Sequence, residues 1–162
     1  MSNYLRPQVT GARVFFTVAL AARGSQVLVD HVERLRGAVQ TTRAERPFAI
    51  DAWVVLPDHL HCVWTLPDGD ADFSTRWRLI KSRFSRGLPK GRLRHSHVNR
   101  SERGIWQRRF WEHHLRDETD YRAHVRYCWI NPVKHGLVER PEEWPYSSVH
   151  SDTRYRTDEV MM

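Results

Sequence analysis

Two periodicities of apolar residues divide the chain into predicted strands and helices. Three short runs, 13–20, 48–56 and 59–66, are rich in β-branched, aromatic and other apolar residues, which predicts strands. Apolar residues recur at every third or fourth position over about 27–46, 72–86 and 117–130, which predicts amphipathic helices. A weaker alternation over 105–115 predicts a fourth strand. The turn Pro57-Asp58 joins the second and third strands as a hairpin.

The order of these elements is strand, helix, strand, strand, helix, strand, helix. This order predicts an α+β fold, with a ferredoxin-like (RRM-like) antiparallel sheet, helices on one face and an additional C-terminal helix. Pro132 and Gly136 are expected to stop that last helix. Residues 1–150 are expected to form one domain, with an irregular aromatic segment at 141–149 packed back on it and a flexible tail at 151–162.

Basic residues are concentrated in one part of the chain, whose formal net charge is +7. Twelve of the 26 Lys and Arg residues lie between Arg76 and Arg109, together with a single acidic residue, Glu102. A positive field of this kind suits a polyphosphate partner. The same region contains a predicted long basic loop, 87–104, to which the sequence assigns no function.

Two histidines, His59 and His61, are separated by one residue in the predicted third strand. Alternate residues of a strand point to the same face, so both imidazoles project together and form half of a divalent metal site. The spacing by itself is a weak signal and more often reflects two unrelated histidines on a polar strand face. A second such pair, His95 and His97, lies in the basic loop, where a metal site would lack supporting contacts.

A polar stripe runs along the predicted last helix, because its members follow one another by three or four residues. The stripe consists of Asp120, His124, Tyr127, Asn131 and Lys134. Taken alone, Tyr127 also fits an amphipathic side chain at the edge of the core, and Asn131 also fits a helix end before Pro132. Taken alone, the stripe therefore favours packing over chemistry.

Several motifs together resemble one known family. They are the segments from Trp53 to His61, from Arg109 to His113, from Asn131 to Gly136 and from Trp144 to Ser148. In order and spacing they resemble the REP-associated tyrosine transposases, domesticated bacterial relatives of the single-tyrosine HUH transposases. The resemblance covers the chain from about Tyr4 to His150.

The resemblance implies an HUH endonuclease fold and assigns roles to residues of both constellations. It implies that Tyr127 is the nucleophile and that His59, His61 and Asn131 hold a divalent metal, Mg²⁺ or Mn²⁺. His124 and Lys134 are candidates for assisting proton transfer or balancing charge. Attack by the tyrosine on DNA would leave a 5′-phosphotyrosine and a free 3′-OH, so that the strand can be rejoined without a nucleotide cofactor.

The substrate that the resemblance implies is single-stranded DNA beside small palindromic hairpins, the REP sequences. Basic residues would follow the phosphate backbone, and Trp106 would stack on bases. The candidate DNA-contacting residues are Arg76, Arg78, Lys81, Arg83, Trp106, Arg108 and Arg109. The protein is expected to act as a monomer or homodimer, and to be cytoplasmic, nucleoid-associated and bacterial, with no membrane partner.

Two other functions are compatible with parts of the pattern. The basic cluster alone would suit a non-catalytic binder of single-stranded nucleic acid on the same sheet. A phosphohydrolase that activates water would use the metal ligands without Tyr127, but the sequence supplies no additional carboxylates of the kind such sites use. Cys62 and Cys128 form no CxxC pattern and are expected to be small buried core residues.

Overall fold

The computed structural model describes residues 5–89 and 104–152. The strands are β1 (Arg13–Ala19), β2 (Ala49–Val55), β3 (His59–Thr65) and β4 (Trp111–His114). The helices are α1 (Val27–Asp30), α2 (Val32–Glu45), α3 (Phe73–Ser85) and α5 (Glu118–Lys134), followed by the short 3-10 helices η1 (Pro141–Glu143) and η2 (Ser148–His150). No helix within the described residues is both long and apolar enough to cross a membrane.

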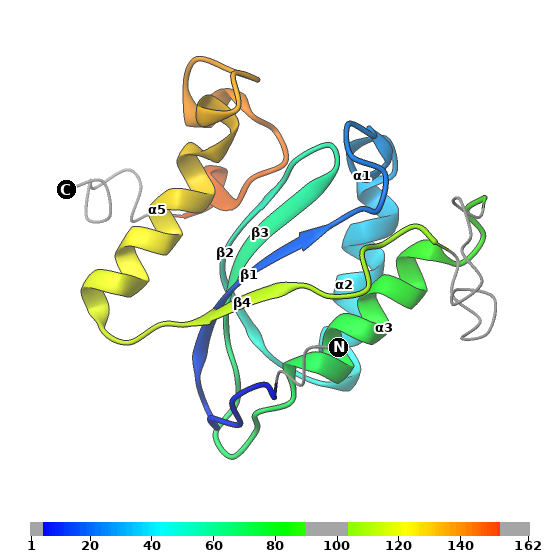
Figure 1. The fold of residues 1–162 in the computed structure, drawn as a ribbon. Coiled ribbons are helices and arrows are strands. Elements are labelled where there is room, and N and C mark those ends of the chain that lie inside the picture. The colour runs from blue at the N-terminus through cyan, green and yellow to red at the C-terminus, as the bar shows by residue number, and fades with distance from the viewer. Residues whose placement is uncertain (1–4, 90–103, 153–162) are drawn as a thin grey trace.

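The four strands form one sheet in the order β2-β3-β1-β4, and each neighbouring pair is antiparallel. Helices α1, α2 and α3 lie on one side of the sheet, whereas α5 crosses the other side (Figure 1). The predicted α+β, ferredoxin-like architecture with an added C-terminal helix is confirmed. Because α5 is the only long helix on its side within the described residues, it determines what the second face of the sheet can contain.

Both faces of β3 are buried, and each belongs to a different core. Leu60, Cys62 and Trp64 pack under α2 and α3, as the alternation predicts. His61 and Val63 point to the opposite face, where α5 packs. The histidine face is therefore not an open polar surface, since the helix that follows β4 closes over it.

The fourth strand is shorter than the sequence predicts. Between the pairs Thr17–Trp111 and Leu20–Trp106, β1 advances by three residues and the edge segment by five. The two additional residues form an irregular bulge between Trp106 and Trp111, which interrupts the strand and leaves Arg108 and Arg109 exposed.

The last helix is longer than the sequence predicts. The expectation that Pro132 stops it is wrong by one turn, because α5 continues to Lys134. Proline removes one backbone N–H donor, but the end of the helix is closed by other bonds. The N–H of Gly136 donates to the Val133 carbonyl at 2.9 Å, and the N–H of Leu137 donates to the Pro132 carbonyl at 2.9 Å. Gly136 has φ +70°, the left-handed conformation that this helix ending requires.

The segment after α5 packs back on the domain, as expected. The backbone N–H of Val55 donates to the Tyr146 carbonyl at 2.8 Å, and the Trp144 indole N–H donates to the Val55 carbonyl at 2.9 Å. These contacts cover the outer edge of β2. The expected tail beyond Asp152 and residues 90–103 of the basic loop, including His95 and His97, lie outside the described residues.

Candidate active site

The predicted nucleophile lies beside one of the predicted metal ligands. The ring centroids of His61 and Tyr127 are 5.1 Å apart, and those of His59 and His61 are 5.0 Å apart. Phe15 of β1 contacts both His61, at 5.5 Å in a stacked arrangement, and Tyr127, at 5.8 Å edge to face. The structure thus brings β1, β3 and α5 together around one small group of rings.

Hydrogen bonds determine which nitrogen each histidine offers to a ligand. Nδ1 of His59 lies 2.7 Å from Oδ1 of Asp58, and Nδ1 of His61 lies 2.8 Å from Oγ1 of Thr17. When Nδ1 carries the proton and donates to these oxygens, the unprotonated Nε2 is the atom that can bind a metal. Asp58 and Thr17 are therefore orienting residues that the sequence reasoning did not identify.

Burial keeps both imidazoles neutral. It lowers the pKa of His61 to about 3, with smaller contributions from the charges of His59, His135 and Lys134. Burial also lowers the pKa of His59, although the neighbouring Asp58 opposes this shift. A neutral imidazole is the form that binds metal ions, so burial between the sheet and α5 supplies the protonation state that a metal site needs.

The side-chain amide of Asn131 is the least satisfied polar group near these rings. Asn131 is fully buried one helical turn after Tyr127, and neither its Oδ1 nor its Nδ2 has a hydrogen-bond partner in the structure. An unpaired buried amide costs about 1–3 kcal/mol, so its retention requires an explanation. An amide oxygen and two neutral imidazole nitrogens are a donor set that fits a divalent cation, and Asn131 lies on α5 between Tyr127 and His135, which contact His61 and His59.

Two cationic or titratable side chains at the end of α5 complete the surroundings. Nζ of Lys134 lies 5.0 Å from the centroid of the Tyr127 ring, which places a positive charge beside the phenol. The ring of His135 lies 5.3 Å from that of His59. His135 belongs to the recognised motif after Asn131, but nothing in the helical spacing pointed to this contact.

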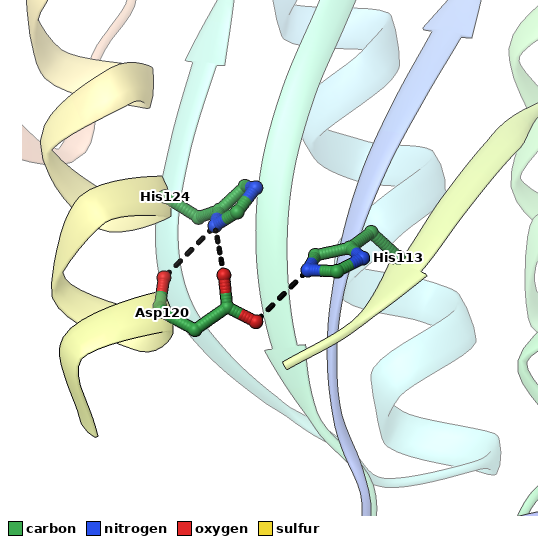
Figure 2. A group of neighbouring side chains, drawn as sticks. All are labelled: His113, Asp120 and His124. Carbon is green, nitrogen blue, oxygen red and sulfur yellow. Dashed lines mark hydrogen bonds and ion pairs between the residues drawn. The ribbon is translucent and has the colours of Figure 1, made fainter. Parts of the chain in front are cut away.

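A second group of metal-ligating side chains lies along α5 and β4. His113 Nε2 is 2.9 Å from Asp120 Oδ2, and His124 Nδ1 is 3.2 Å from Asp120 Oδ1 and 2.8 Å from the Asp120 carbonyl (Figure 2). Their ligand atoms all lie within 4.8 Å of one another. Burial alone would raise the pKa of Asp120, but the Arg116 backbone N–H and His113 outweigh it and lower this pKa.

The two groups differ in what their donor atoms already bind. In the second group, the contacting nitrogens of His113 and His124 already meet oxygens of Asp120, so a cation would have to displace these hydrogen bonds. The amide of Asn131 has no such partner. A cation at the first group would meet an amide without a partner, whereas the second group already forms a clamp between β4 and α5.

The candidate assisting residue His124 belongs to the second group. Its ring contacts Phe15 at 4.8 Å and His113 at 4.8 Å, and its Nδ1 is bound to Asp120. His113 and His114 point to opposite faces, as strand alternation predicts, because His114 contacts Phe73 under α3.

Among the predicted DNA-contacting residues, Arg76 requires a correction. Its side chain is 2% exposed and makes a bidentate ion pair with Asp70, at 2.7 and 3.1 Å. The guanidinium also donates to the carbonyls of Arg46, Pro47 and Asp72. With its donors committed inside the protein, Arg76 stabilises the fold and cannot reach a phosphate.

The remaining candidates differ in how strongly the fold holds them. Arg83 donates to Thr42 and Glu45 of α2, and the Trp106 indole N–H donates to the Lys81 carbonyl at 3.2 Å. The side chains of Arg78, Arg108 and Arg109 are exposed. A cleft of about 640 Å³ between α3 and residues 104–110 is lined by several of these residues, including Arg78, Lys81, Trp106 and Arg108.

This basic cleft and the tyrosine lie on different sides of the sheet. Helix α3 covers one face and α5 the other, with β4 at the edge between them (Figure 1). The bulge with Arg108 and Arg109 is located at this edge. A DNA molecule that contacts both regions would therefore have to pass around β4.

Known proteins similar to this chain agree with the motifs. A REP-associated tyrosine transposase of Escherichia coli K12 is 48% identical over 152 residues, which cover 94% of this chain and 85% of that protein. A Haemophilus influenzae relative bearing the same family name is 43% identical over 157 residues, covering 95% and 89% respectively. No protein-family model matches the chain.

Solved structures support the same assignment. The structure of a REP-associated tyrosine transposase bound to a REP hairpin has a TM-score of 0.82 at 48% identity, covering 94% of this chain and 86% of that one. A Deinococcus radiodurans protein, with a TM-score of 0.50 and 16% identity over 84% of this chain and 98% of that one, shares the fold. The chain shares close to half of its residues with the Escherichia coli protein over 94% of its own length. It therefore belongs to the REP-associated tyrosine transposases.

Proposed function

We propose that this protein cleaves and rejoins single-stranded DNA beside a REP-like palindromic hairpin, with Tyr127 as the nucleophile. The observation that carries the proposal is the contact between Tyr127 and His61, whose ring centroids are 5.1 Å apart. It places a phenol beside a buried neutral imidazole, one turn before the unpaired amide of Asn131. The hairpin-bound relative supports the choice of substrate.

The reaction exchanges one phosphate ester for another. The Tyr127 phenolic oxygen attacks phosphorus, and the bond between phosphorus and the 3′ oxygen breaks. The phenol loses its proton and the departing 3′ oxygen takes one up, which yields a 5′-phosphotyrosine and a free 3′-OH. Because the ester bond is retained on the protein, the reverse reaction rejoins a strand without a nucleotide cofactor.

The residues around Tyr127 would promote this attack. A phenol is mostly protonated at neutral pH and needs stabilisation of its anionic form. The Lys134 ammonium, 5.0 Å from the ring centroid, supplies a positive charge there. Phe15 contacts the rings of both Tyr127 and His61 and thereby restricts their orientation before DNA binds.

We further propose that His59, His61 and Asn131 hold a divalent ion, Mg²⁺ or Mn²⁺. Asp58 and Thr17 orient the two imidazoles, and the buried Asn131 amide supplies an oxygen that lacks another partner. When bound there, the ion would polarise a phosphate oxygen of the substrate. Nitrogen from two imidazoles suits Mn²⁺ better than Mg²⁺.

The proposal is tested by trapping the covalent product. Hairpin DNA with a single-stranded flank is incubated with Mn²⁺ and analysed on a denaturing gel. A label at the 3′ end should remain with the protein, whereas a label at the 5′ end should leave on a fragment with a 3′-OH. Tyr127→Phe should form no adduct, and the matched control Tyr146→Phe, a half-buried tyrosine outside the site, should form as much as the wild type.

Two results would contradict the proposal. Adduct formation by Tyr127→Phe would assign the nucleophile elsewhere, and cleavage without any adduct would indicate attack by water. Tight binding of the hairpin with no metal-dependent cleavage would instead support a non-catalytic nucleic-acid-binding protein.

The metal site has a test that does not depend on cleavage. Mn²⁺ should raise the thermal unfolding temperature of the wild type and of Asp120→Asn, but not that of Asn131→Leu. The opposite pattern would place the ion at the group of His113, Asp120 and His124.

A further inference from the structure

The edge of the sheet beside the candidate active site carries an aromatic side chain that the reaction does not use. Trp111 is 56% exposed, and it is the only aromatic residue among the large exposed apolar side chains of the described residues. An exposed indole offers a large aromatic face, and tryptophan is enriched at binding interfaces. Trp111 lies on strand β4, where the backbone holds it in place.

The strand register relates Trp111 directly to the metal ligands. Thr17 pairs with Trp111 on one side and with His61 on the other, so the three residues form one row across the sheet. The hydroxyl of Thr17 contacts Nδ1 of His61 at 2.8 Å. Two strand spacings of about 4.7–4.9 Å separate His61 from Trp111, about 9–10 Å along the row. That separation corresponds to one or two nucleotides of a single strand.

Neighbouring rings fix the orientation of the indole. Trp111 is parallel to His113, with ring centroids 6.0 Å apart and planes 11° apart, and it meets Phe15 edge to face at 5.8 Å. His113 is held in turn by Asp120 at 2.9 Å. The indole is therefore preorganised on a rigid element, which lowers the entropy that a ligand must remove on binding.

The charge around Trp111 selects the kind of ligand. The exposed residues Arg108 and Arg109 lie in the bulge before β4, and Arg108 also lines the basic cleft. An aromatic platform next to basic side chains is the combination that binds single-stranded nucleic acid, since bases stack while phosphates meet cations. An apolar protein partner would not need these charges.

We propose that Trp111 stacks on an unpaired base of the single strand next to the scissile phosphate, as that strand passes around β4 toward Tyr127. This inference rests on the proposed function, because it takes its substrate from there. Trp111 would be a binding residue that sets the position of the strand, and it would do so without hydrogen bonds that read the base. Trp106, the stacking residue expected from the sequence, is half-buried against Phe84, whereas Trp111 is exposed.

The experiment measures the coupling between Trp111 and one base. Binding of a REP-type hairpin with a short single-stranded flank is followed by fluorescence anisotropy in EDTA, and each flank nucleotide is replaced in turn by an abasic one. Trp111→Ala should weaken binding by about 5- to 150-fold, and Trp111→Phe should restore much of the loss. At one flank position the abasic substitution should weaken wild-type binding by a similar factor and leave Trp111→Ala unaffected.

A matched variant distinguishes base stacking by Trp111 from a general loss of exposed apolar surface. Val9→Ala, a change of an exposed apolar residue before β1, should leave binding unchanged. Equal sensitivity of wild type and Trp111→Ala to every abasic position would overturn the inference, as would a change of oligomeric state in Trp111→Ala as its only effect. If a covalent adduct forms but no abasic position depends on Trp111, stacking is refuted and the proposed function stands. If one position depends on Trp111 but no adduct forms, stacking stands and the proposed function is refuted.

Discussion

Acid should destabilise the metal-free protein through His61, by an amount that follows from its burial. The pKa of His61 is lowered from 6.5 to about 3 in the folded protein, mainly by burial. Above pH 6.5 the imidazole is neutral in both states and contributes nothing to pH dependence. Below it, the unfolded chain binds a proton that the folded chain refuses, so stability falls as pH falls.

The loss of stability is about 1.36 kcal/mol for each pH unit below the ordinary pKa of the imidazole. At pH 5, about 1.5 units below the ordinary pKa, His61 should account for roughly 2 kcal/mol of lost stability. The loss should approach roughly 5 kcal/mol near pH 3, where the folded protein also takes up the proton. The pKa of His59 is lowered as well, so its contribution has the same sign.

Urea unfolding in EDTA at about pH 7 and pH 5 measures this effect. The free energy of unfolding of the wild type should fall by about 2 kcal/mol more over this interval than that of His61→Gln, which cannot titrate. His31→Gln changes an exposed histidine and should behave like the wild type. An equal fall in wild type and His61→Gln would refute the assignment of a buried, neutral His61.

The pH interval separates histidines from carboxylates. The pKa values of four aspartates, Asp58, Asp70, Asp72 and Asp120, are lowered below 3.8 by hydrogen bonds and nearby charges that outweigh any effect of burial. Their stabilising contribution is fully present above that value and disappears only at lower pH. A fall between pH 7 and pH 5 therefore reports on imidazoles.

Four further outcomes are expected. Without metal, Asn131→Leu should raise the free energy of unfolding by about 1–3 kcal/mol, because it removes buried polar atoms that lack partners. Urea unfolding in EDTA measures this change. Arg76→Met should lower the same quantity by about 2–4 kcal/mol, since it leaves Asp70 and several carbonyls unpaired. Arg78→Gln should keep stability within about 0.5 kcal/mol, weaken hairpin binding and reduce its salt dependence by about one ion in anisotropy titrations. Asp120→Asn should lower the free energy of unfolding in urea by about 1–2 kcal/mol, because it weakens the clamp between β4 and α5.

The sequence could predict those parts of the fold that local patterns determine. The alternation of apolar residues in β3 placed Leu60 and Cys62 toward one core and His61 toward the other face. The helical repeat placed Tyr127 and Asn131 on one stripe. Both predictions use only the direction of side chains along one element, and that direction depends on backbone geometry alone.

Properties that depend on contacts between distant segments could not be predicted in the same way. The basic cluster suggested that Arg76 meets DNA, but the loop with Asp70 folds back and encloses its guanidinium. The alternation over 105–115 predicted one continuous strand, but two additional residues between Trp106 and Trp111 form a bulge that shortens β4. Proline in a helix is a strong local signal, yet the bonds after Pro132 extend α5 beyond it.

Helix α5 links the protonation state of the proposed metal ligands to the position of the proposed nucleophile. Its packing on β2 and β3 creates the second core, and burial in that core keeps His59 and His61 neutral. The same helix carries Tyr127 to His61 and holds the unpaired amide of Asn131 one turn later. Separating α5 from the sheet would therefore hydrate both histidines, return their pKa values toward the ordinary range and withdraw the tyrosine in one event. The packing of α5 that buries the unpaired amide of Asn131 is thus the same packing that keeps the two imidazoles in the neutral form that the proposed metal site requires.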